Sequence, residues 1–175
     1  MYTNHIPKLT KAPLQEVIFE AFWELDIHPQ SRESDDPGFE LAQGVFAEIV
    51  RQEFPFYKRV APPLVPVHFL LHRPVHQFWR GHAQWPVLQL GPGLLSANDT
   101  EETYVWESGF RPVIEYALDT VLKSYIKEAP RFNKVSLRYI DAVELEGEFQ
   151  INFVKFIETN LQIRVARDFE IGSTE

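Results

Sequence analysis

The chain of 175 residues contains no cysteine. Disulfide bonds, zinc–thiolate sites, iron–sulfur clusters and cysteine nucleophiles are therefore excluded. The sequence also has no run of about 18 consecutive apolar residues, and residues 1–15 lack the uninterrupted apolar segment of a signal peptide. We therefore expect a cytoplasmic protein that does not associate with a membrane.

Basic residues are also few. The chain carries 17 Lys and Arg residues against 25 Asp and Glu residues, which gives a formal net charge of −8 at pH 7. Nucleic-acid affinity depends largely on Lys and Arg side chains that neutralise phosphates, and this sequence has no run of basic residues. We therefore do not expect nucleic acid as a partner.

Hydrophobic and aromatic residues are plentiful, at 45% and 14% of the chain, and Phe alone occurs 14 times. A chain of this length can bury roughly two thirds of the surface that its unfolded form exposes. We expect an α+β domain over residues 1–145 and a C-terminal helix and strand extension over residues 146–175.

The stretch "EVIFEAFWEL" (16–25) places three glutamates four positions apart among β-branched and aromatic residues. That composition favours a strand over residues 14–25, preceded by Pro13. Alternation would put Val17, Phe19, Ala21, Trp23 and Leu25 on one face, and Glu16, Ile18, Glu20, Phe22 and Glu24 on the other. Because each glutamate would lie about 13 Å from the next along a strand, the three cannot form one catalytic or metal site by themselves.

The rest of the sequence predicts alternating blocks of helix and strand. Asp36 is expected to cap a helix that begins at Pro37 and ends near Phe54. The predicted elements that follow are a proline-stiffened connector (58–67), short meander strands (67–73, 75–81 and 86–98, with a tight turn at 91–93), a long helix (106–130), a strand (133–145), a short helix (149–160) and a last strand (161–171). The order β-α-β-β-β-α-β-α-β indicates an α+β fold with helices on one face of a mostly antiparallel sheet.

Two groups of polar residues are candidates for chemical sites. The strand over 133–145 would place Val135, Leu137, Tyr139 and Val143 on its inner side, and Arg138 on its other side within reach of Glu16 or Glu20, as a structural pair. Four histidines, His68, His72, His76 and His82, lie within fifteen residues, but on strands His68 and His72 would be about 13 Å apart, too far to hold one ion. A hairpin at Arg73–Pro74 could bring His72 beside His76, which gives two ligands without a third, so we expect no metal and no cofactor. A ligand site formed by Glu20, Arg138 and His76 stays open as an alternative.

Four stretches together resemble a sporadically distributed bacterial family of uncharacterised proteins: "APLQEVIFEAFW" (12–23), "VLQLGPGLLSAN" (87–98), "YVWESGFRPVI" (104–114) and "SLRYIDAVEL" (136–145). The resemblance covers roughly residues 12–145. It implies a shared fold. Members of this family are typically longer than 175 residues, so this chain is either the full protein or an N-terminal portion, and in the second case 146–175 would begin a second part. A sheet edge or apolar face near residues 145–175 would then be exposed, as a surface that oligomer contacts cover.

The sequence contains no nucleophile elbow, phosphate loop or catalytic triad spacing, and we expect no catalytic residues. Aromatic side chains in and beside the meander serve either core packing or an interaction surface; the candidates for that surface are Phe78, Trp79, Trp85 and Trp106. The hypothesis that follows is a non-enzymatic module that binds another protein or its own copy through a sheet face or edge. One alternative is an enzyme or small-ligand binder with a pocket between the long helix and the sheet. A third choice is a nucleic-acid-associated accessory protein, which would need a basic surface that the net charge hides.

Overall fold

The structure, a computed structural model, describes residues 13–27, 32–100, 102–144 and 152–163. The chain divides into two compact units, Met1–Asp141 and Ala142–Glu175. The first unit is an α+β domain, which confirms the predicted fold class.

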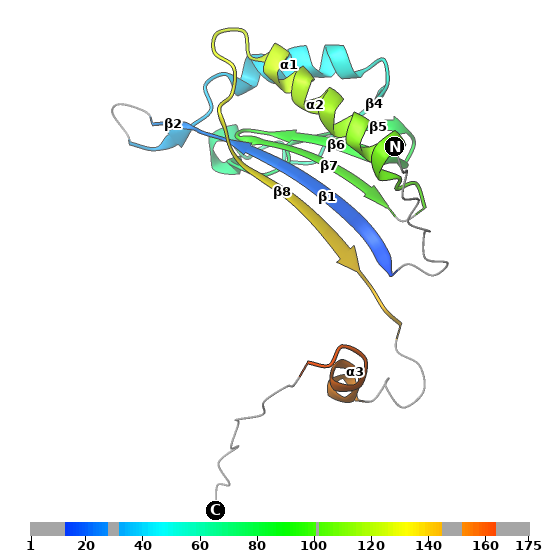
Figure 1. The fold of residues 1–175 in the computed structure, drawn as a ribbon. Helices are drawn as coiled ribbons and strands as arrows, with labels where there is room; N and C mark the ends of the chain where they lie inside the picture. The colour runs from blue at the N-terminus through cyan, green and yellow to red at the C-terminus, as the bar shows by residue number, and fades with distance from the viewer. Residues whose placement is uncertain (1–12, 28–31, 101, 145–151, 164–175) are drawn as a thin grey trace, which may run out of the picture. The chain divides into compact units, whose positions relative to one another are not determined.

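One six-stranded antiparallel sheet forms the base of the first unit (Figure 1). Its strands are β1 (Leu14–Trp23), β4 (Phe56–Arg59), β5 (His76–Gly81), β6 (Gln84–Gly91), β7 (Leu94–Thr100) and β8 (Phe132–Asp141), and they lie in the order β4-β5-β6-β7-β1-β8. Strands β4 to β7 form a meander, and β1 then inserts between β7 and β8. A separate two-stranded ribbon pairs β2 (Asp26–Ile27) with β3 (Ser34–Asp35).

The described α-helices of this unit, α1 (Phe39–Val50) and α2 (Arg111–Ser124), cover one face of the sheet (Figure 1). β1 contributes to the core the residues that were predicted for its inner face: Val17, Phe19, Ala21 and Trp23 are all buried. From α1, Phe46 packs against Phe78 with ring centroids 5.3 Å apart. The alternation of β1 was therefore predicted correctly, and it defines a helix side and an open side of the sheet.

Three predicted elements differ from the structure. Residues 67–73 were predicted to form a strand, but Val67–Leu70 form a 3-10 helix, η1, in which the Phe69 N–H donates to the Pro66 carbonyl. The meander begins instead with β4. This strand was not predicted from the sequence, in which residues from Lys58 onward were assigned to an extended connector. The long helix starts as a π-helix, η2 (Trp106–Phe110), and ends at Ser124, earlier than predicted.

The second unit contains one described helix, α3 (Phe153–Asn160), inside the segment predicted to be helical. The Asn152 side chain accepts a hydrogen bond from the Lys155 N–H and so satisfies a backbone donor of the first turn. Residues 161–163 are not in a strand, and the remainder of the predicted last strand, from residue 164, lies outside the described residues.

Candidate interaction surface

Strand β8 ends the sheet, and its outer edge pairs with no strand in the part of the chain that the structure describes. The Trp23 N–H donates to Gly93 on the β7 side, and the next residue, Glu24, donates to Arg131 on the β8 side. Because backbone groups alternate along a strand, this pattern turns the N–H and C=O groups of Ser136 and Arg138 toward β1. The backbone groups of Val135, Leu137 and Tyr139 therefore point outward, to the free edge.

The side chains of these three outward residues lie on the helix side of the sheet. Val135, Leu137 and Tyr139 lie opposite Ala21, Phe19 and Val17 of β1, which are buried. In β8, however, Val135 is 63% exposed, Leu137 40% and Tyr139 51%. The predicted inner face of β8 thus has the right orientation, but the described helices leave much of it exposed, because α2 packs mainly over β7.

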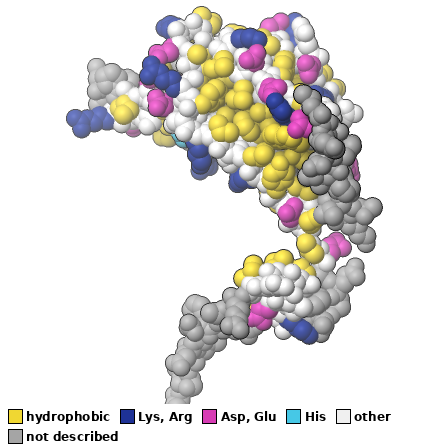
Figure 2. Space-filling view, in the orientation of Figure 1, with side chains coloured by type: hydrophobic (Ala, Val, Ile, Leu, Met, Phe, Trp, Pro, Cys, Tyr) yellow, Lys and Arg dark blue, Asp and Glu magenta, His cyan; other side chains and the backbone are white. Residues whose placement is uncertain are grey.

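We call the outer edge of β8 together with Val135, Leu137 and Tyr139 the β8 surface. At one end, the Tyr139 hydroxyl lies 2.8 Å from the Tyr104 hydroxyl, and the two rings meet edge to face. Burial and this hydrogen bond raise the pKa of Tyr104 above its ordinary value, so its phenol is neutral at physiological pH. In the space-filling view, hydrophobic side chains gather in one continuous area with acidic and basic side chains around it (Figure 2).

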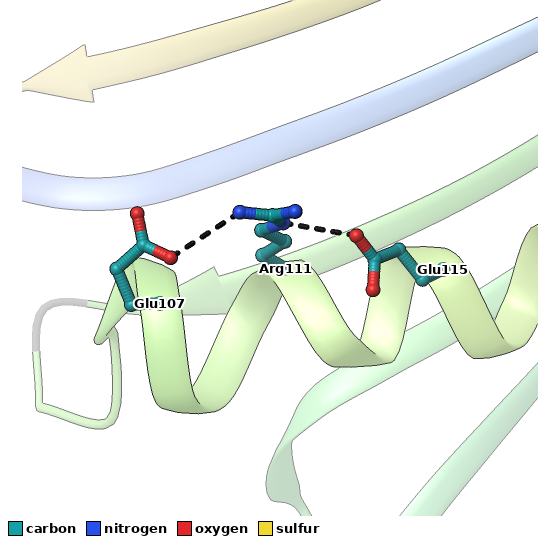
Figure 3. A network of polar contacts seen from close by, with 3 residues as sticks. All are labelled: Glu107, Arg111 and Glu115. Carbon is teal, nitrogen blue, oxygen red and sulfur yellow. Dashed lines mark hydrogen bonds and ion pairs between the residues drawn. The ribbon is translucent and has the colours of Figure 1, made fainter.

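The exposed side of α2 carries a polar network. Arg111 contacts Glu107 through Nη1 at 3.3 Å and Glu115 through Nε at 2.9 Å, and the three side chains line up along successive turns (Figure 3). The hydrogen bond from Arg111 to Glu115 and the charge of that carboxylate raise the pKa of Arg111. Ion pairs this exposed contribute little stability, so the network serves mainly as a solvated surface beside the core.

The open side of the sheet holds the predicted ion pair between Arg138 and Glu20. Arg138 lies opposite Ile18 and reaches diagonally along the strand, placing Nη2 3.0 Å from Glu20 Oε2. The prediction that Arg138 pairs with Glu16 or Glu20 is therefore confirmed for Glu20. Glu16 instead accepts a hydrogen bond from Asn98 Nδ2 at 2.7 Å.

Asn98 belongs to a ladder of side-chain amides that crosses four strands on the open side. Gln77 donates to Gln89 at 3.1 Å, Gln89 donates to Asn98 at 3.1 Å, and Asn98 donates to Glu16. Each of these groups already has a partner inside the sheet, so the ladder satisfies buried and half-buried polar atoms. This arrangement has a structural role, because it links the side chains of neighbouring strands.

His76 lies on the opposite side of the sheet from Glu20 and Arg138. Its ring is buried between Phe39 and Tyr57, and Nδ1 is 2.8 Å from the Tyr57 hydroxyl. Burial, with a smaller effect of the Arg59 charge, lowers its pKa to about 4. The structure therefore brings Glu20 and Arg138 together and separates His76 from both, so these residues do not form one ligand site.

Asp36, predicted to cap α1, has a different role. Its Oδ2 accepts hydrogen bonds from Trp23 Nε1 at 3.0 Å, the Gly93 N–H at 2.9 Å and the Tyr125 hydroxyl at 2.8 Å. Burial, followed by the charge of Asp36, raises the pKa of Tyr125. A hollow of about 440 Å³ lies beside this cluster, and its lining includes none of Glu20, His76 and Arg138.

The predicted aromatic surface is only partly exposed. Phe78 faces the helices and is buried in the core, so it cannot belong to a surface. Trp79 and Trp85 contact each other edge to face at 5.3 Å and are half-buried, and Trp106 packs against the core. Exposed apolar residues also lie on β8, and the sequence did not assign them to a binding surface although their alternation was visible there.

Comparison with protein-family models, curated proteins and solved structures finds no match. Among the described helices, none is long and apolar enough to cross a membrane. The described residues also contain no cluster of three or more His, Asp or Glu side chains that could hold a metal ion. The function of this protein is therefore inferred from the surfaces of the chain itself.

Proposed function

We propose that this protein is a non-enzymatic binding or assembly module that recognises another polypeptide through the β8 surface. The observation that carries the proposal is the combination, in one strand, of a free ten-residue edge and three exposed apolar side chains. Unpaired edges and contiguous apolar surface are features that soluble proteins usually cover or blunt, and they mark sites of strand addition.

The ligand-binding alternative has weaker support. Glu20 and Arg138 satisfy each other on the open side, and His76 lies in the core on the other side. The amide ladder is likewise internally paired. A pocket between α2 and the sheet would have to form where the core residues Val113, Ala117 and Val121 already pack.

Site-specific photo-crosslinking in the cells that naturally make the protein tests the proposal. Benzoylphenylalanine is incorporated in place of Tyr139 and, as a control, in place of Leu64, which is 94% exposed on the Pro-rich connector. We expect a crosslinked polypeptide from position 139 and none from position 64. The adduct should disappear when Val135→Lys and Leu137→Lys are added, since lysines disfavour both apolar contact and edge pairing. Equal crosslinking from both positions, or an adduct that survives the lysines, would contradict the proposal.

A further inference from the structure

The composition of β8 narrows the choice of partner. Strand β8 presents apolar residues at every second position from Val135 to Tyr139 on the helix side, and its charged residues, Lys134, Arg138 and Asp141, are spread along its length. A strand with this distribution can meet an antiparallel copy of itself without opposing its like charges. Whether it does so depends on the register of the pairing.

Three neighbouring twofold registers differ in which side chains they oppose. With Ser136 on the axis, Lys134 of each copy faces Arg138 of the other, so that two like-charge pairs form. With Arg138 on the axis, the two Arg138 side chains face each other. Like charges directly opposite each other across strands are destabilising, so both registers are disfavoured.

The register with Leu137 on the axis avoids these contacts. Leu137 then meets Leu137, Val135 meets Tyr139, Ser136 meets Arg138, Lys134 meets Ile140, and Asn133 meets Asp141. All three exposed apolar residues of the β8 surface find apolar partners, and no like charges are opposed. Glu20 also neutralises Arg138 within each copy.

Resting on the proposed function, we propose that the partner of the β8 surface is a second copy of this chain. The two β8 strands pair antiparallel, edge to edge, with Leu137 on the twofold axis. Such a contact is isologous, because the same residues are used by both copies, and it joins the two sheets into one continuous sheet. Leu137 forms a hydrogen-bonded pair in this dimer, with Cα atoms about 5.5 Å apart.

The absence of native cysteine allows this register to be mapped with single cysteines. Leu137→Cys should crosslink to itself with a short bifunctional thiol reagent and yield a species of twice the 20.4 kDa monomer mass. Val135→Cys and Tyr139→Cys should not crosslink alone, because equivalent residues are about 13 Å apart in this register. An equal mixture of those two variants should crosslink between them.

Light scattering over a range of protein concentrations completes the test. We expect a dimer that Leu137→Lys converts to a monomer, whereas Leu41→Lys, at an exposed leucine on α1, leaves it dimeric. A monomer at every concentration, or a dimer that only Leu41→Lys disrupts, would refute the claim that the β8 surface binds a second copy. If the protein is monomeric but position 139 still photo-crosslinks a different polypeptide, this inference fails and the proposed function stands. If the protein is monomeric and position 139 photo-crosslinks no polypeptide, the inference and the proposed function both fail.

Discussion

Leu137 of β8 lies directly opposite Phe19 of β1 on the same side of the sheet, yet Phe19 is 6% exposed and Leu137 is 40% exposed. The hydrophobic core therefore ends between two adjacent hydrogen-bonded strands. Beyond that boundary, the described part of the chain places apolar side chains against solvent on a strand whose outer backbone groups are unpaired. This discontinuity is the structural reason for assigning an interaction to β8.

Because the core ends between β1 and β8, two matched leucine substitutions should differ in how much they lower the free energy of unfolding. Leu95→Ala removes a fully buried leucine of β7 and should lower the free energy of unfolding by about 2–5 kcal/mol through lost burial and a cavity. Leu137→Ala should cost under about 1 kcal/mol in the monomer, because much of the side chain already contacts water. Urea unfolding at low protein concentration measures both values. Equal losses would show that Leu137 is covered within one copy.

Asp36 is predicted to be the most sensitive acidic residue of the first unit. Asp36→Ala leaves two buried donors, from Trp23 and Gly93, and the half-buried Tyr125 hydroxyl without their shared acceptor, and should cost about 3 kcal/mol or more. Asp119→Ala is the control, because Asp119 forms an exposed contact of 3.2 Å with Lys123 one turn away, worth about 0.5 kcal/mol at most. Similar losses of stability for the two variants, measured by urea unfolding, would refute the role assigned to Asp36.

Because His76 is buried, we expect the folded protein to lose stability in mild acid. Burial lowers its pKa to about 4 in the folded protein, against the ordinary histidine value of 6.5 that applies to the unfolded chain. Below pH 6.5 the unfolded state therefore takes up a proton that the folded state does not. Stability from this group should fall as pH decreases from about 6.5 to about 4, by up to about 3 kcal/mol.

Unfolding measurements at several pH values test this effect in two variants. His76→Phe retains stacking with Phe39 and Tyr57 but cannot titrate, so its stability should vary less across that pH range. His82→Asn, at an exposed position, should keep the dependence of the natural chain. A His76→Phe variant with an unchanged pH profile would exclude His76 as the cause.

The ion pair between Glu20 and Arg138 should contribute little to stability. Arg138 is largely exposed, and an exposed cross-strand pair is worth roughly 0.2–1 kcal/mol. A double-mutant cycle with Glu20→Gln and Arg138→Gln measures the coupling energy directly. A coupling well above that range would point to a role beyond the pairing of β1 with β8.

Local patterns in the sequence were sufficient to predict the main elements of this fold. The alternation in β1 and β8 and the three-four spacing in α2 identified two strands and a helix, because each pattern reflects burial on one side. Segments without such a pattern were less predictable. All residues of β4 are exposed, so burial leaves no alternation there, and Val67–Leu70 has a strand-like composition although Pro66 starts a 3-10 turn.

Long-range contacts explain the remaining differences. The three donors to Asp36 come from positions 13, 57 and 89 residues away in the chain, so a cap was the only role that the local sequence could indicate. Alternation likewise could not show that Phe78 faces the core while Trp79 does not. The extent of helix coverage over β8 depends on where α2 packs, which no local pattern encodes.

Hydrogen exchange at the backbone amide of Leu137 tests the central claim most directly. Residue-resolved exchange is measured by NMR on the natural chain at low and high protein concentration, with Arg138, whose N–H faces β1, as the internal reference. If two copies pair through β8, exchange at Leu137 slows at high concentration toward the rate of Arg138, while the rate of Arg138 changes far less. Fast exchange at Leu137 that does not depend on protein concentration would contradict the account.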